Sequence, residues 1–152
     1  MGLSNSEFET ILADTTKQID GDIDWQEDED HSPALEFRTD VRSDAGWPLF
    51  VRGSFNSLAG TLTFALILKT DGRMYGLDLG KDHHNPTCQM VGDPHKHRWS
   101  EGFRDKQAYR PDDITKPADD PVGVWRQFCL EARIVHNGAL RQPTPEYRET
   151  FL

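Results

Sequence analysis

Residues 95–99, with the sequence HKHRW, bring together side chains that can transfer protons and bind anions. His95 and His97 are two positions apart, so in an extended backbone both imidazoles project from one face. A histidine acts as an acid or a base near neutral pH, and lysine and arginine carry the positive charge that holds a phosphate. We therefore interpret His95 and His97 as candidate catalytic residues, and Lys96 and Arg98 as candidate phosphate contacts.

Three further side chains near this segment suit an RNA or nucleotide ligand. Trp99 and Tyr109 offer aromatic rings on which a base can stack, and Arg104 adds positive charge. RNA supplies its own nucleophile, the 2′-hydroxyl, so its cleavage needs no metal. The first hypothesis is therefore binding, and metal-independent cleavage, of RNA or a phosphorylated small molecule. Residues 81–116 carry seven bases and six acids, so the same side chains also suit a solvated surface.

The histidines support a second hypothesis, in which the segment binds a metal ion. Zinc takes nitrogen and sulfur ligands, which here would come from His83, His84, Cys88, His95 and His97. Their spacing matches no standard zinc ribbon or finger and includes no CxxC pair. The sequence therefore favours a site without a cofactor and keeps zinc as the alternative. In the simpler interpretation His83 and His84 face solvent in a loop and Cys88 is packed or inert.

The acidic residues of the chain are concentrated near its N-terminus. The net charge is −9, and residues 1–30 hold ten acids against one base, whereas residues 31–152 carry sixteen of each sign. General binding to a nucleic-acid backbone is not predicted from this balance. The segment from Asp20 to Asp30, with Trp25 as an aromatic anchor, gives a third hypothesis: an interaction module or inhibitor that docks on a basic or nucleic-acid-binding protein.

Four segments with alternating polarity predict an antiparallel meander, and its last hairpin places an acid near the histidines. Residues 61–70 and 73–80 flank Asp71-Gly72, the pair that a two-residue type I′ turn prefers. Pairing Thr70 with Arg73 puts the large apolar residues on one face and leaves Asp78 as the only acid on the other. Asp78 is therefore the candidate carboxylate that orients His95 or His97.

Helical patterns flank the predicted sheet. Ser4 and Glu7 form a capping-box pattern before a helix over residues 5–19. Asp120-Pro121 opens a second helix, which Asn137-Gly138 is expected to end. The predicted fold class is α+β: an N-terminal helix, a four-stranded antiparallel meander, a long histidine-containing connection and a C-terminal helix packed on the sheet.

The length of 152 residues predicts one domain, 1–152, because a chain of this size buries one hydrophobic core. Its irregular parts are an acidic loop over residues 20–33, a connection over 81–118 and a tail over 139–152. No apolar run approaches the about 20 residues that span a bilayer, and the two cysteines are far apart. We therefore expect a cytoplasmic protein with no membrane contact. GxSxG, Walker, GxGxxG and HExxH motifs are absent, so no enzyme class is indicated.

The run LDLGKDHHNPTCQMVGDPHKHRWSEGFRDKQAYRPDDI, at residues 77–114, resembles a segment of small uncharacterised bacterial proteins. The similarity extends over most of the chain. This resemblance implies a bacterial cytoplasmic protein. It implies no activity and assigns no catalytic residue, because that family has no activity to carry over.

Overall fold

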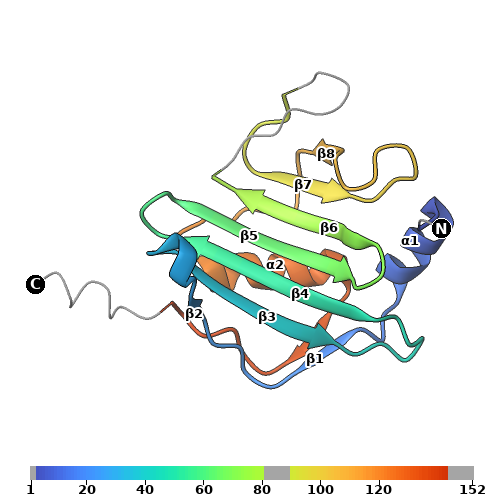
Figure 1. Cartoon of the computed structure of the whole chain (residues 1–152), viewed down its shortest axis with the longest axis horizontal. Helices are drawn as coiled ribbons and strands as arrows, with labels where there is room; N and C mark the ends of the chain where they lie inside the picture. The colour runs from blue at the N-terminus through green and yellow to red at the C-terminus, as the bar shows by residue number, and fades with distance from the viewer. Residues whose placement is uncertain (1–2, 81–89, 144–152) are drawn as a thin grey trace, which may run out of the picture.

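The protein is α+β, and the computed structural model describes residues 3–80 and 90–143. A seven-stranded sheet has the order β2-β3-β4-β5-β6-β7-β8, and helix α2 crosses behind it (Figure 1). The sheet strands are β2 (Gln26–Glu27), β3 (Leu35–Val41), β4 (Leu49–Asn56), β5 (Thr61–Leu68), β6 (Gly72–Leu79), β7 (His95–Arg98) and β8 (Ala108–Tyr109). The other elements are α1 (Asn5–Ala13), β1 (Gln18–Asp20), the 3-10 helix η1 (Glu29–His31), α2 (Pro121–Ala132) and β9 (Val135–Asn137). Neither described α-helix is long and apolar enough to cross a membrane.

Strands β3 to β6 form the predicted four-stranded meander, and the hydrophobic core lies between them and α2. The Trp125 ring from α2 lies 5.1 Å from the Phe64 ring and 5.8 Å from the Phe37 ring, between ring centroids. Gly53 leaves room for this packing, because a Cβ atom there would lie 2.1 Å from the Phe37 ring. The opposite face of the sheet, which carries Asp78, faces the viewer in Figure 1. We call it the open face.

The predicted register of the β5–β6 hairpin is wrong by two residues. Leu66 pairs with Tyr75 and Phe64 with Leu77, rather than Leu68 with Tyr75. Side chains alternate with a period of two, so a two-residue shift keeps every apolar side chain on the core face. The sequence pattern therefore predicts the face correctly and cannot detect the shift. A bulge between Leu66 and Ile67 absorbs the irregularity near the turn.

Both predicted helices end earlier than expected. The residues that follow them include β1 and β9, which form a small second sheet. Helix α1 stops at Ala13, because the Asp14 carboxylate accepts hydrogen bonds from the backbone N–H of Thr16 at 2.8 Å and from its hydroxyl at 2.6 Å. Helix α2 stops at Ala132, where Arg133 adopts a left-handed conformation with φ 55°. Strands β1 and β9 then pair in parallel.

The part of the 81–118 connection that the structure describes is more regular than predicted. Strand β7 extends the sheet beyond β6 and is followed by the short strand β8. The first four residues of the HKHRW segment form β7, which lies between β6 and β8 and is not an edge strand. The two candidate histidines therefore lie on a strand that is paired on both sides.

Lys17 closes the C-terminal end of α1. Its side chain is fully buried, and its ammonium donates hydrogen bonds to the carbonyls of Ile11 and Leu12. These carbonyls belong to the last turn of the helix, where backbone acceptors lack helical partners. Burial lowers the pKa of Lys17 to about 8, because removing the side chain from water disfavours its charged form.

Replacing Lys17 with Met tests whether the Lys17 ammonium is buried in the folded protein. The measured quantity is the pH dependence of stability. The folded-state pKa is lower than the unfolded one, so the unfolded chain binds more protons between about pH 8 and about pH 10.5 and wild-type stability rises with pH there. We expect the free energy of unfolding of wild type minus K17M to grow by about 1–2 kcal/mol from about pH 7.5 to about pH 9.5. Urea unfolding at both pH values measures it. A difference that stays constant or shrinks contradicts the assignment.

Candidate functional site

Asp78, His95 and His97 meet on the open face of the sheet. Strands β6 and β7 pair antiparallel, with Asp78 opposite His95 and Gly76 opposite His97. The Nε2 atoms of His95 and His97 lie 3.1 Å and 3.3 Å from the same carboxylate oxygen, Oδ2 of Asp78. All three residues are buried, with exposed fractions of 6% for Asp78 and 2% for each histidine. We call these three residues the His–Asp cluster.

Backbone carbonyls fix the orientation of both imidazole rings. His95 Nδ1 lies 3.2 Å from the carbonyl oxygen of Gly92, and His97 Nδ1 lies 2.8 Å from that of Asp105. A carbonyl oxygen only accepts hydrogen bonds, so each Nδ1 carries the proton. In the neutral form of either ring, Nε2 then has a lone pair. This lone pair is directed toward Asp78.

Three acceptor atoms therefore converge when both histidines are neutral: two Nε2 lone pairs and Oδ2 of Asp78. Acceptors that converge in this way are stabilised by a positively charged group between them. A proton can fill this role, because a protonated Nε2 donates a hydrogen bond to Oδ2 of Asp78. A metal ion fills it with both rings neutral, and a backbone carbonyl on Nδ1 is the usual second-sphere partner of a metal-binding histidine.

The distances within the His–Asp cluster fit a metal ion. Ligand atoms bound to zinc at about 2.1 Å and at tetrahedral angles are separated by about 3.4 Å. The two distances to Asp78 Oδ2 are 3.1 Å and 3.3 Å, and all three candidate ligand atoms lie within 4.8 Å of one another. It is the one such group of three metal-binding side chains within residues 3–80 and 90–143.

The second oxygen of Asp78 is occupied by a neighbour on β5. Thr63 lies opposite Asp78 in the β5–β6 pairing, and its hydroxyl donates a hydrogen bond of 2.6 Å to Oδ1. This bond leaves Oδ2 as the oxygen that faces the histidines. A carboxylate held in this way acts as a single-oxygen ligand, which suits zinc better than the multidentate oxygen cages of calcium.

Arg73 lies beside the His–Asp cluster and was not predicted from the sequence. Its Nε is 3.2 Å from Oδ2 of Asp105, and its Nη2 donates to the Asp105 carbonyl at 3.3 Å. The same carbonyl oxygen accepts the hydrogen bond from His97 Nδ1. Gly76 makes room for Arg73, because a Cβ atom there would lie 3.0 Å from Cδ of the arginine. No sequence signal could show this position, since the bulge in the hairpin directs Arg73 onto the open face.

Lys96 lies on the opposite face of β7, and this position gives no support to its predicted role as a phosphate contact. Alternation along the strand turns it toward α2, where its side chain is fully buried. Its ammonium donates to both carboxylate oxygens of Asp113, at 2.7 and 2.6 Å, and to Glu131. Burial acts to raise the pKa of Glu131, but the hydrogen bond and charge of Lys96 outweigh it and lower the pKa. Lys96 is thus an internal ion-pair partner.

The other predicted ligand contacts also lie away from the His–Asp cluster. Arg98 lies 3.5 Å from a carboxylate oxygen of Glu9 in α1, and the Tyr109 hydroxyl donates to Glu131 at 3.0 Å. Trp99 is buried and donates its indole N–H to the Leu3 carbonyl at 2.8 Å, so its ring is not available for stacking a base. The exposed guanidinium of Arg104 lies 5.4 Å from the Trp99 ring centre.

Three of the predicted zinc ligands, His83, His84 and Cys88, lie outside the described residues. The remaining two, His95 and His97, are in the His–Asp cluster. Asp78 was predicted only as an orienting carboxylate. It occupies the position of a third ligand.

The acidic segment from Asp20 to Asp30 is bound to the body of the protein. Asp22 and Asp24 each lie 2.8 Å from the guanidinium of Arg141, and Asp20 lies 3.1 Å from Arg42. The Trp25 ring packs 5.0 Å from that of Phe37 in the core. This arrangement gives no structural support to a segment that docks on another protein, and that role stays a prediction.

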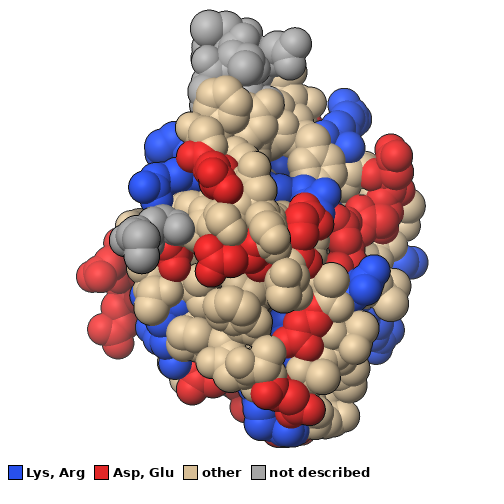
Figure 2. Space-filling view, turned by 90° about the vertical axis from the view of Figure 1, so that its right-hand side faces the viewer, with Lys and Arg blue, Asp and Glu red and all other residues tan. Residues whose placement is uncertain are grey.

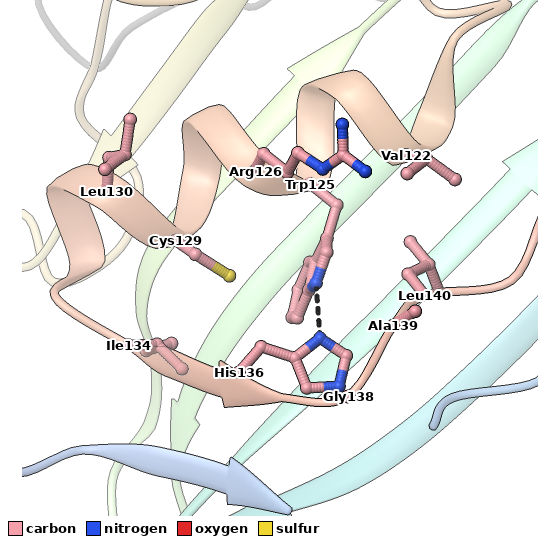
Figure 3. A pocket seen from close by; sticks show the side chains of 10 residues that line it. All are labelled: Val122, Trp125, Arg126, Cys129, Leu130, Ile134, His136, Gly138, Ala139 and Leu140. Carbon is pink, nitrogen blue, oxygen red and sulfur yellow. Dashed lines mark hydrogen bonds between the residues drawn. The ribbon is translucent and has the colours of Figure 1, made fainter. Parts of the chain in front are cut away.

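A groove of about 400 Å³ between α2 and β9 is a second concave site (Figure 3). Trp125 and His136 point toward each other across it, and the indole N–H donates to Nδ1 of His136 at 3.1 Å. His136 Nε2 donates in turn to the Gly21 carbonyl at 2.8 Å. Burial raises the pKa of Cys129 to about 12, so its thiol stays protonated and is a weak nucleophile. The Trp125 indole and the His136 imidazole that line the groove bond to each other, and the imidazole also bonds to the backbone. We therefore interpret the groove as a packing contact between α2 and β9.

Surface charge is mixed rather than concentrated. The face shown in Figure 2 carries both acidic and basic side chains among neutral ones. This distribution agrees with the balanced charge of residues 31–152. The face offers no electrostatic reason to expect general binding of a nucleic-acid backbone.

The chain matches the protein-family model described as Family of unknown function (DUF6978) over residues 3–134. The chain belongs to this family. The match confirms the predicted resemblance to uncharacterised proteins. No curated protein and no solved structure matches the chain. The matched range contains Asp78, His95 and His97, so the His–Asp cluster lies within the part of the chain that the family model describes.

Replacing Lys96 with Met tests whether Lys96 is an internal ion-pair partner. Removing one member of a buried ion pair leaves the other charges without compensation, which costs about 3 kcal/mol. We expect K96M to lower the free energy of unfolding by about 2–3 kcal/mol, because Asp113 and Glu131 can regain some water. Urea unfolding measures this change. A surface phosphate contact would instead alter stability by less than about 0.5 kcal/mol.

Proposed function

We propose that this protein binds a divalent transition-metal ion, zinc in the first instance, through Asp78, His95 and His97. One observation carries the proposal. Both Nε2 atoms lie at ligand–ligand distances from the same Asp78 oxygen, while each Nδ1 donates its proton to a backbone carbonyl. The ring orientation is therefore the one that a metal-binding histidine needs.

The composition of the cluster supports a transition metal over calcium or magnesium. Imidazole nitrogen is a preferred ligand of zinc, copper, iron and nickel, whereas calcium and magnesium take oxygen ligands. Within residues 3–80 and 90–143 the cluster offers two histidines and one carboxylate, and three is the number of protein ligands found in zinc sites that keep one position for water or substrate. We therefore propose a site of the catalytic type, built on the paired strands β6 and β7.

The geometry gives less support to metal-independent cleavage of RNA. His95 and His97 are each 2% exposed, and their Nε2 atoms face Asp78. General acid–base catalysis needs the imidazole within hydrogen-bond reach of the substrate proton. Lys96 is buried on the other face of β7, so a phosphate near the histidines would not meet it. The hypothesis stays a prediction without a supporting contact at this site.

Metal content and metal affinity test the proposal directly. We expect one zinc ion per chain by elemental analysis after zinc loading and dialysis. D78N and H97Q should each weaken zinc binding by at least about 100-fold, since loss of even an outer-sphere partner costs about 10–100-fold. Zinc affinity should fall in acid, because protons compete with the metal ion for its ligand atoms.

His31 provides the matched control. It is exposed and its Nδ1 lies 3.0 Å from a carboxylate oxygen of Asp28, so H31A removes a histidine without touching the His–Asp cluster. H31A should bind zinc like the wild type, and far-UV circular dichroism should show that D78N and H97Q are folded. Zinc at about 100 times its dissociation constant should stabilise the wild type by about 2.7 kcal/mol. Absence of stoichiometric zinc, together with an unchanged melting temperature in excess zinc, would overturn the proposal.

A further inference from the structure

We infer that Arg73 makes the metal-loaded site an oxyanion-binding site, in which a phosphate group binds next to the ion and to the guanidinium together. This inference rests on the proposed function, because the metal ion supplies half of the anion contact. It assigns a ligand class to the site, namely a molecule that carries a phosphate. Arg73 would then contact the ligand directly rather than act through another residue.

The contacts of Arg73 leave one side of its guanidinium for such a ligand. Nε and Nη2 are used by the carboxylate and the carbonyl of Asp105. Nη1 lies 3.9 Å from Oδ2 of Asp78, which is too long for a hydrogen bond. The N–H groups of Nη1 thus lie close to the His–Asp cluster without a hydrogen bond to the Asp78 oxygen. Guanidinium presents its donors in a fixed plane that matches the oxygens of phosphate.

Charge at the site depends on the metal. With neutral histidines, the carboxylates of Asp78 and Asp105 and the guanidinium of Arg73 leave one net negative charge. A divalent ion changes this to one net positive charge. Phosphate should therefore bind the metal-loaded protein and not the metal-free protein. Zinc and arginine together stabilise the negative oxygens of a phosphate group, as such clamps do in phosphoryl-transfer sites.

Arg73 is more exposed to solvent than the three residues of the His–Asp cluster. The exposed fraction of its side chain is 27%, against 2% and 3% for the side chains of His95 and His97. Gly76 lies beneath it on β6, and no Cβ atom pushes the guanidinium away from the sheet. A ligand phosphate would approach over Arg73.

Cobalt(II) in place of zinc gives a spectroscopic test, because its visible spectrum reports its ligands. Inorganic phosphate added to the cobalt-loaded wild type should change the spectrum in a saturable way. R73M should bind phosphate at least tenfold more weakly, and R73K should bind with intermediate affinity. Acetate, tested in parallel, distinguishes a phosphate site from a general carboxylate site: acetate binding as tight as phosphate binding would overturn the assignment of the ligand class.

The metal affinity of R73M separates ligand binding from mere positioning. Arg73 repels the cation, so R73M should bind cobalt as tightly as the wild type or more tightly. If Arg73 only oriented the Asp105 carbonyl for His97, R73M would bind cobalt about 10–100-fold more weakly and its phosphate affinity would not change specifically. That result would overturn the inference. Failure of the wild type to bind cobalt or zinc at all would instead overturn the proposed function, and with it the anion site.

Arg52 provides the matched control. It is exposed and lies in the same cross-strand row as Gly76 and His97, with Ala65 between. At about 4.8 Å per strand it is about 14 Å from His97, so R52M removes the same charge without a direct contact. R52M should bind phosphate like the wild type. An equal loss of phosphate binding in R52M and R73M would show a diffuse charge effect and contradict the site.

Discussion

Strand β7 pairs with β6 over four residues, and this pairing determines what each side of the strand can do. It places His95 opposite Asp78 and His97 opposite Gly76, so two imidazoles and one carboxylate share the open face. The intervening residue, Lys96, points to the other face and binds Asp113 and Glu131. A shift of β7 by one residue would exchange these two sets of side chains. The candidate metal centre therefore depends on the register of one short strand.

Backbone groups on both sides of β7 complete the site. The carbonyl of Gly92 holds the His95 ring, and the carbonyl of Asp105 holds the His97 ring. Arg73 binds the same Asp105 residue through its carboxylate and its carbonyl. The segments before and after β7 would thus supply the outer sphere of a metal ion bound by the His–Asp cluster. A site with such an outer sphere loses little side-chain freedom when an ion binds, which favours affinity.

Sequence patterns predicted the sheet well, because apolar alternation reports which face of a strand is buried. They also placed Asp78 on the open face with the two histidines expected to project from one face. They could not give the cross-strand neighbours, since a two-residue shift in the β5–β6 hairpin leaves the pattern unchanged. Thr63 was therefore not recognised as the partner of Asp78. The predicted lengths of both helices were wrong because local capping at Asp14 and Arg133 overrode the periodicity.

The role of Lys96 and the position of Arg73 needed tertiary information. A lysine between two histidines suggested a cationic surface, but its partners lie 17 and 35 residues away in the chain. Arg73 was predicted to begin the strand after the turn, paired with Thr70, and only the bulge in the hairpin brings it beside Asp78. Sequence reasoning also ranked a metal-free site above zinc because it counted ligand spacing along the chain. In a sheet, residues far apart in the sequence become neighbours when their strands pair, as Asp78 and His95 do.

X-ray absorption of the zinc-loaded protein tests the central claim most directly, because it reports the atoms bound to the ion. The His–Asp cluster predicts nitrogen and oxygen neighbours at about 2.0–2.1 Å, with outer-shell scattering from two imidazole rings. H97Q should retain the signature of at most one ring. A spectrum of oxygen neighbours without imidazole scattering, unchanged in H97Q, would contradict a metal centre at Asp78, His95 and His97.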